Sequence, residues 1–363
     1  MPAPLSAIEA ISPAFDRTKR ELFKPFRIGF WLRMALVALA TGEIYGGSGW
    51  GGAHFNLPSS RRVLALQTGM AMPPIEVLKH YLPLLVLLVP LVFVLIFLWI
   101  YISSVFRFVL FDSVLTDRCV IKEQWSRWRS AGMSFFLWRI CFGLGVMLSL
   151  GVLGGAGFMA VFATGALKNP RQHMVFLILG GIVAVLVLLA FVIVAALIAV
   201  FARDFVVPVM ALENVGVVEG WRRVIPMLTA EKKAYAGYVL MKIVLILGSA
   251  ILFGIVTVVA VFLLFIPLSL AGVALYLFAK AEGLLWSFPA VAAAVILGAG
   301  VLATILYVIA FISAPAMVFF QAYVIDFLGS RYAALGDRIS PPPVPPTPAV
   351  PPSFPDAGVL PAG

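Results

Sequence analysis

The sequence predicts an all-α protein, a polytopic bundle of transmembrane helices. Of its 363 residues, 63% are hydrophobic and only 12% are charged, whereas a soluble domain keeps about a quarter of its residues charged. Several apolar runs exceed the roughly 20 residues that a helix needs to cross the hydrocarbon of a membrane. The alternation of polar and apolar residues that a membrane β-barrel requires is absent from the sequence. Helices therefore account for the apolar runs.

Hydropathy predicts six spans, at residues 28–45, 81–105, 134–163, 175–201, 235–266 and 289–314. The first is the weakest, and the glycine-rich residues 44–58 that follow it read as an exposed loop. The third and fifth are longer than the membrane is thick, so we expect them to tilt or to project from it. The apolar residues 268–288 are expected to lie along the membrane surface or to re-enter the membrane.

Polar or proline-rich segments flank this membrane domain, which we assign to residues 28–340. Residues 1–27 carry five basic side chains, and we expect a cytoplasmic amphipathic segment there. A cleaved signal peptide does not fit, because its charged leader would be too long and its apolar core too short. Residues 341–363 contain ten prolines and predict an unfolded cytoplasmic tail, which serves as a tether or as a proline-rich docking ligand.

Basic residues are distributed unevenly between the two sides of the predicted bundle. Seventeen of the 26 lie in the N-terminal segment, in the connections 106–133 and 202–234, and in the C-terminal segment, whereas six lie on the opposite side. By the positive-inside rule, both termini are cytoplasmic. The net charge of +10 indicates anionic membrane lipid as the partner. A protein partner stays open, and nucleic acid is not expected.

The remaining three basic residues lie inside predicted spans and recur at a regular interval. They are Arg33, Arg139 and Lys242, separated by 106 and 103 residues. Each follows at least one aromatic residue near the cytoplasmic start of an odd-numbered span. This recurrence predicts a threefold repeat of helical hairpins, at 28–105, 134–201 and 235–314.

A second set of similar phrases supports the repeat. Each even-numbered span is followed by an apolar segment that ends in an acidic residue. These acidic residues are Asp117, Glu213 and Asp326. Two of these phrases lead to tryptophan and basic residues, which predict amphipathic segments in the membrane interface. The candidate headgroup-anchoring residues are Arg33, Arg139, Lys242, Trp125, Arg127, Arg129, Trp221, Arg222 and Arg223.

Two interpretations of the three charges within the spans remain open. In the first, each side chain snorkels, so that its stem stays in hydrocarbon and its charged end reaches the cytoplasmic phosphates. In the second, Arg33, Arg139 and Lys242 converge on one lipid headgroup or other anion.

No pattern of catalytic or metal-binding residues is found. His54, His80 and His173 belong to separate connections without metal-ligand spacing, and Cys119 and Cys141 have no histidine nearby in the sequence. We therefore expect no enzymatic activity, no metal and no cofactor. The predicted function is a non-enzymatic membrane protein with a scaffold or accessory role, whose basic cytoplasmic face binds lipid or a partner. The alternative is a transporter or flippase-like pathway for a small or lipidic substrate.

The exit phrases also carry a family resemblance. An F-V-x-x-x-x-x-L phrase, an acid and then W-x-R or W-R-R follow the second and fourth spans, most clearly at Phe205 to Arg223. Over residues 15–335 the chain resembles an uncharacterised family of bacterial polytopic membrane proteins, similar to the membrane domain attached to some glycerophosphodiester phosphodiesterases. The resemblance implies the bacterial inner membrane. The catalytic barrel of those enzymes is absent, so it implies no phosphodiesterase activity.

Overall fold

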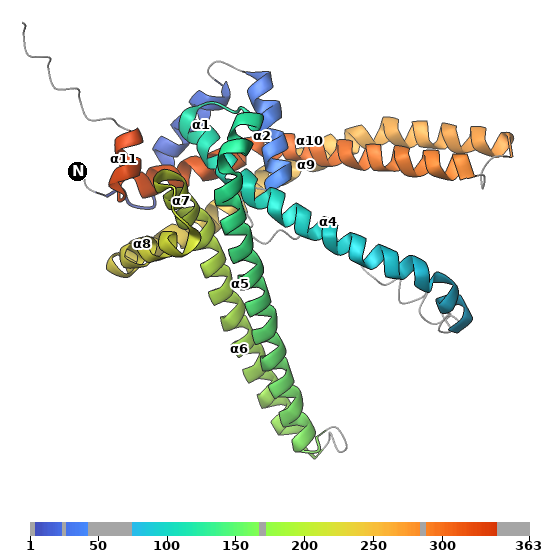
Figure 1. Cartoon of the computed structure of the whole chain (residues 1–363), viewed down its shortest axis with the longest axis horizontal. Coiled ribbons are helices and arrows are strands. Elements are labelled where there is room, and N and C mark those ends of the chain that lie inside the picture. The colour runs from blue at the N-terminus through green and yellow to red at the C-terminus, as the bar shows by residue number, and fades with distance from the viewer. Residues whose placement is uncertain (1–3, 24–26, 43–74, 167–171, 284–287, 340–363) are drawn as a thin grey trace, which may run out of the picture.

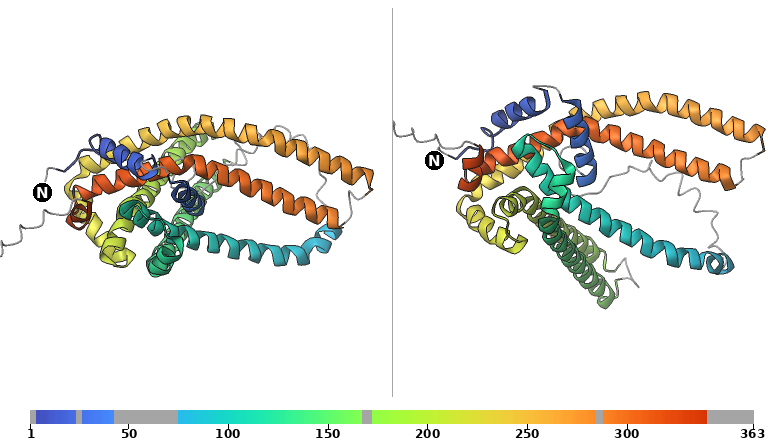
Figure 2. Two further views of the ribbon diagram at one scale, coloured as in Figure 1. Left: turned by 90° about the horizontal axis from the view of Figure 1, so that it is seen from above. Right: turned by 45° about the horizontal axis from the view of Figure 1, so that its top comes forward.

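The computed structural model is all-α and describes residues 4–23, 27–42, 75–166, 172–283 and 288–339. The predicted loop at 44–58 and the tail at 341–363 lie outside these residues. Long helices form three arms that diverge from one packed region, here called the base (Figure 1). The views in Figure 2 show the same divergence from other directions.

Five long helices build the arms: α4 (Ile75–Thr116), α5 (Ile121–Ala163), α6 (Met174–Phe201), α9 (Lys232–Ala281) and α10 (Phe288–Gly329). The π-helical turn η1 (Ala202–Val206) joins α6 to α7 (Val207–Glu213). The other short helices are α1 (Ile11–Phe23), α2 (Ile28–Thr41), α8 (Val217–Ala230) and α11 (Ala333–Ile339). Helices α5 and α6 form one arm, α9 and α10 form a second, and α4 forms the third.

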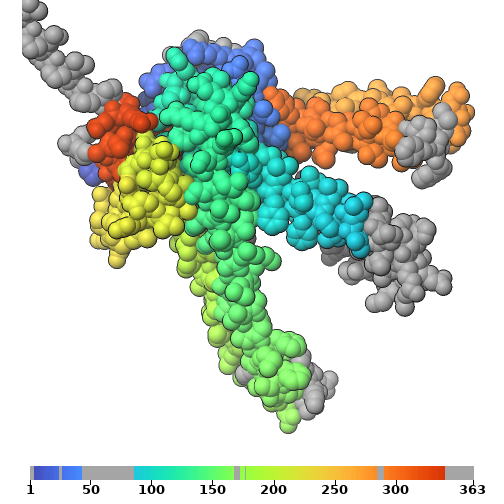
Figure 3. Space-filling model, viewed as in Figure 1, coloured from blue at the N-terminus to red at the C-terminus, as the bar shows by residue number. Residues whose placement is uncertain are grey.

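The arms are apolar and almost entirely exposed. Among the described residues, the five long helices are long and apolar enough to cross a membrane, and at most 6% of the most apolar window of each is buried inside the protein. Figure 3 shows the arms standing apart from one another. Such surfaces are stable in hydrocarbon and not in water. The five helices therefore indicate a multi-pass membrane protein.

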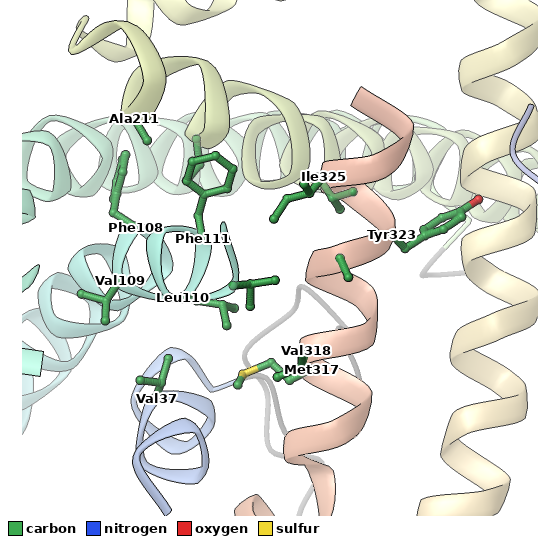
Figure 4. Close-up of a cluster of buried hydrophobic side chains, with 14 of the residues drawn as sticks. Val37, Phe108, Val109, Leu110, Phe111, Ala211, Met317, Val318, Tyr323 and Ile325 are labelled. Atoms are coloured by element: carbon green, nitrogen blue, oxygen red, sulfur yellow. The ribbon is translucent and has the colours of Figure 1, made fainter. Parts of the chain in front are cut away.

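The hydrophobic core is confined to the base. Side chains from α2, α4, α7 and α10 meet there, among them Val37, Phe108 and Met317 (Figure 4). Aromatic rings of η1, α9 and α10 pack beside them, with the rings of Tyr238 and Phe327 4.7 Å apart and those of Tyr238 and Tyr323 stacked at 5.2 Å. Burial of these large rings holds the three arms together at one end.

The structure shortens the first of the six predicted spans. Helix α2, predicted to extend over 28–45, has 14 residues and ends at Thr41, so its length is about 21 Å, against about 30 Å of hydrocarbon. Half of its residues are buried in the base. Five helices of spanning length are thus found in the described part of the chain. The last three residues of the predicted first span, 43–45, lie outside the described residues.

Several segments predicted as connections are helical. The apolar segments that follow the even-numbered spans continue the helices. Helix α4 extends to Thr116, and α6, η1 and α7 run without interruption to Glu213. Helix α9 continues to Ala281, so residues 268–281 extend the same helix and form no separate segment. Pro267 lies inside this helix. Proline removes only one backbone donor, and hydrocarbon offers no alternative partner to the other backbone groups, so the helix persists.

Candidate functional site

A group of basic side chains gathers where the three arms meet. Arg107 comes from α4, Arg139 from α5, Arg203 from η1 and Lys242 from α9. Arg107 and Lys242 are 9% and 4% exposed, which is unusual for such residues unless they are compensated. We call these four residues the basic cluster.

Asp204 lies at the centre of the basic cluster and is 4% exposed. Its Oδ2 atom lies 2.5 Å from Nζ of Lys242 and accepts a hydrogen bond from the hydroxyl of Tyr238 at 3.0 Å. Its Oδ1 atom accepts a hydrogen bond from Nε of Arg203 at 3.0 Å. One carboxylate therefore fixes two cations, which belong to different arms.

Arg139 is held by a different arm. Its Nη1 atom donates to the hydroxyls of Ser103 and Ser104 on α4, at 3.2 and 3.3 Å. Both serines are buried. The contact ties the start of the α5–α6 arm to α4 and fixes the position of the guanidinium group.

The basic cluster borders a cavity of about 230 Å³ between α4, α5 and α6. Arg107, Arg139 and Arg203 line it together with apolar residues of α5 and α6. On α5, the stacked rings of Trp138 and Phe142, 5.1 Å apart, form part of the wall. The cavity thus joins a cationic end to an apolar end.

An adjoining cavity of about 20 Å³ shares Arg107 and Arg203 with the first and is also lined by Asp204 and Lys242. Among the described residues, the two linings contain the four basic residues of the cluster and one acidic residue, Asp204. Cationic side chains from three arms therefore meet at the two adjoining cavities.

Comparison with protein families finds a match over most of the chain. The model of a family of unknown function, DUF7544, matches residues 5–338. The chain belongs to the DUF7544 family. Comparison with curated proteins and with solved structures finds no match.

In this DUF7544 protein, the three charges predicted inside spans lie in the base but do not converge. Arg139 and Lys242 border the adjoining cavities described above. Arg33 is exposed, and its Nη1 atom donates to the backbone carbonyl of Cys119 at 2.9 Å. The snorkelling interpretation does not hold for Lys242, because its ammonium group is buried against Asp204.

The tryptophan residues predicted as interfacial anchors pack partly against the protein. Trp125 lies edge-on to Tyr101 of α4, with 6.0 Å between the ring centroids. Trp221 of α8 lies 6.0 Å from Trp138 of α5. Both tryptophans are half-buried, so they also connect the base to the start of the α5–α6 arm.

The basic residues that accompany these tryptophans in the DUF7544 chain are mostly at the surface. Arg127 and Arg129 are exposed, and the guanidinium of Arg127 lies 4.8 Å from the centroid of the Trp128 ring. Arg222 is exposed beside Glu219, with 3.5 Å between charged atoms, whereas Arg223 pairs with both Glu213 and Glu219. Arg127, Arg129 and Arg222 thus remain exposed at the surface of the base.

A further ionisable group lies where α1 meets the end of α4. Glu21 of α1 is 8% exposed, and burial, together with the nearby Asp117 carboxylate, raises the pKa of Glu21 to about 9. Burial also raises the pKa of the Cys119 thiol. Burial therefore favours the protonated form of both groups.

The sequence did not reveal two residues of the basic cluster, Arg107 and Arg203, or Asp204 at its centre. They lie in segments that were predicted as cytoplasmic connections, whereas the structure places them in continuous helices. One feature of the sequence could have indicated the continuous helices. No helix-breaking residue lies between the apolar spans and these three charged residues. Among the described residues, no group of three or more His, Cys, Asp or Glu side chains could hold a metal ion.

Proposed function

We propose that this DUF7544 protein is a non-enzymatic integral protein of the bacterial inner membrane. Basic residues on its packed base bind anionic lipid on the cytoplasmic side. Its role would be that of a scaffold or accessory protein. The observation that carries the proposal is the separation of two surfaces: the arms are apolar and exposed, whereas the base is rich in exposed basic side chains. Hydrocarbon suits the first surface and anionic headgroups suit the second.

The exposed basic residues support lipid as the partner of the base. The side chains of Arg127 and Arg222 are 59% and 81% exposed. Each accessible Lys or Arg near a membrane surface contributes about 1 kcal/mol of attraction to anionic lipid. Several such residues around the base would therefore enrich anionic lipid next to the protein.

Cytoplasmic placement of the base is part of the same proposal. The positive-inside rule places the basic connections in the cytoplasm, and those connections belong to the base. With the base there, the arms extend outwards through the membrane and both termini are cytoplasmic. The resemblance to the membrane domain of some glycerophosphodiester phosphodiesterases fits this topology and remains a prediction.

The threefold hairpin repeat also remains a proposal, with support from the packing at the base. Helix α4 packs on α5, and α10 packs on α1 and α2. Nη2 of Arg17 on α1 lies 2.8 Å from Oδ1 of Asp326 on α10, so the last hairpin contacts the start of the chain. A cyclic arrangement of three similar units would produce such a contact.

The alternative of a transporter receives no specific support. A transporter needs a polar path near the membrane midplane, and the two cavities described above lie at the base. The diverging arms are consistent with lipid between them, which does not require a transported substrate.

Extraction of the protein with its surrounding lipid tests the proposal. Polymer nanodiscs that carry the protein are expected to contain a higher fraction of anionic phospholipid than nanodiscs from the same membrane without it. Replacing Arg127, Arg129 and Arg222 by Gln is expected to reduce this enrichment. Equal lipid composition in all samples would contradict the proposal.

A further inference from the structure

We propose that the base holds a binding site for one phosphate group, in an open cavity where the starts of α2 and α5 meet three arginines. The cavity has a volume of about 280 Å³. Among the described residues, it shares no lining residue with the two cavities that the basic cluster borders. The inference goes beyond the proposed function, because it assigns one ligand group to named donors and applies to a lipid and to a soluble molecule alike.

Two helices begin at the edge of this cavity. Gly29 and Phe30 lie in the first turn of α2, Val120 immediately precedes α5, and all three line the cavity. The first backbone N–H groups of a helix have no partner within the helix, and the helix dipole makes that end positive. In the described part of the chain, no side chain caps the start of either helix. Both helix starts are therefore suited to receive an anion.

Three arginines line the same cavity. Arg27 immediately precedes α2, Arg33 lies in the second turn of α2, and Arg118 lies in the connection between α4 and α5. Nη1 of Arg33 donates to the backbone carbonyl of Cys119 at 2.9 Å, so the guanidinium group is held beside the start of α5. A guanidinium group has five N–H donors. Other donors of Arg33 thus remain for a ligand.

The charge of the lining favours an anion. Within the described residues, no carboxylate forms an ion pair with Arg27, Arg33 or Arg118. Asp117 is the one acidic residue of the described lining, and it also lies beside Glu21 of α1. Three guanidinium groups and two helix starts therefore face one carboxylate.

A phosphate group fits these donors better than a carboxylate does. Its oxygens point in several directions, so it can accept hydrogen bonds from guanidinium groups and from backbone N–H groups at the same time. Guanidinium also matches the spacing of phosphate oxygens. Gly29 leaves the backbone of α2 open on this side, because a Cβ atom there would meet nothing within 4 Å.

Two sources can supply the phosphate group. A phospholipid headgroup is the first, since Ile28 and Val120 beside the cavity are 59% and 46% exposed and offer apolar surface to the rest of a lipid. A soluble phosphate is the second. The recognition chemistry is the same in both cases, and the experiment separates them.

A pair of variants at one position tests the site. Gly29→Asp places a carboxylate at the first turn of α2, where it repels phosphate. An acidic side chain favours the start of a helix, so this variant should not lower the melting temperature. Gly29→Asn has nearly the same shape without the charge and is the matched control. Arg118→Gln removes one donor, and Arg338→Gln, at an exposed position on α11 that does not line the cavity, is its control.

Binding is measured on the full-length protein in detergent with two probes. Phosphatidylglycerol is added in steps and followed by native mass spectrometry, and inorganic phosphate is titrated in a calorimeter. Binding of the probe that occupies the site should be about tenfold or more weaker in Gly29→Asp than in Gly29→Asn, and in Arg118→Gln than in Arg338→Gln.

The outcomes separate the two sources and the two proposals. An effect on phosphatidylglycerol alone assigns the site to a lipid headgroup, an effect on inorganic phosphate alone assigns it to a soluble phosphate, and an effect on both shows that they share it. Equal binding in Gly29→Asp and Gly29→Asn would overturn the inference, as would the absence of binding of either probe. If anionic lipid is still enriched in nanodiscs while neither probe binds, the site is refuted and the proposed function stands.

Discussion

Lys242 of α9 and Asp204 of η1 form an ion pair in which both side chains are buried, with Nζ and Oδ2 2.5 Å apart. The pair joins two arms at the base, and the same carboxylate also holds Arg203 and Tyr238. Removal of one partner from a buried pair leaves an uncompensated charge, which costs more than the pair itself contributes.

Asp204→Asn is therefore expected to lower the free energy of unfolding by about 3–5 kcal/mol. The double variant Asp204→Asn with Lys242→Met should recover part of this loss, because no lone lysine charge remains in the pair. Glu219→Gln, which removes solvent-accessible pairs with Arg222 and Arg223, should change stability by at most about 1 kcal/mol. Thermal unfolding in detergent measures all three. Similar effects of Asp204→Asn and Glu219→Gln would show that the buried pair has no special role.

The close approach of α4 and α5 at Gly132 gives a second prediction. A Cβ atom at Gly132 would lie 2.9 Å from the backbone Cα of Val105, so Gly132→Ala should force the helices apart and cost about 1–3 kcal/mol. Gly145→Ala on the same helix meets nothing within 4 Å and should be neutral or stabilising, because alanine favours helix. Equal melting temperatures for the two variants would contradict the packing of α4 on α5.

Glu21 predicts a specific pH dependence of stability. Its folded pKa, about 9, lies above the ordinary value of 4.5. The folded state therefore binds the proton more tightly, and the contribution of this group to stability falls as the pH rises from about 4.5 to 9. Glu21→Gln should remove this loss and raise the melting temperature at pH 8.5 more than at pH 5. A Gln variant that parallels the intact protein at every pH would exclude the buried carboxyl as the cause.

The Arg17–Asp326 contact predicts how α1 is held. Arg17→Ala removes an ion pair of 2.8 Å between largely buried side chains, so α1 should detach more often and be cleaved faster by trypsin at Lys19 and Arg20. Lys19 is exposed, and Lys19→Gln should leave cleavage at Arg20 at the rate found in the intact protein. Limited proteolysis followed by mass spectrometry gives both rates. Unchanged cleavage in Arg17→Ala would mean that other contacts hold α1.

The membrane-protein class and the positions of the long helices followed from the sequence, because long apolar runs have few other stable conformations. The positions at which the helices end could not be predicted from the sequence. Hydropathy falls at Arg107 and Arg203, so those residues read as the start of connections, but helical hydrogen bonding continues past them into the base. Arg139 and Lys242 were recognised because apolar residues surround them in sequence.

The partners of the charges could not be predicted in the same way. Lys242 and Asp204 are 38 residues apart, and Arg139 and Ser103 are 36 apart. Only the packing of one arm on the next brings each pair together. The end of α2 has a local cause instead, because Gly42 adopts a left-handed conformation with φ 73° and caps the helix after Thr41.

The central claim, a base in the cytoplasm with arms that cross the membrane, is tested most directly by cysteine labelling. In a variant without Cys119 and Cys141, single cysteines are introduced at Glu282, an exposed position at the far end of α9, and at Arg129, an exposed position in the base. A membrane-impermeant thiol reagent applied to sealed, right-side-out cells should label the cysteine at position 282 and reach that at position 129 only after permeabilisation. Labelling of position 129 and protection of position 282 in sealed cells would contradict the account.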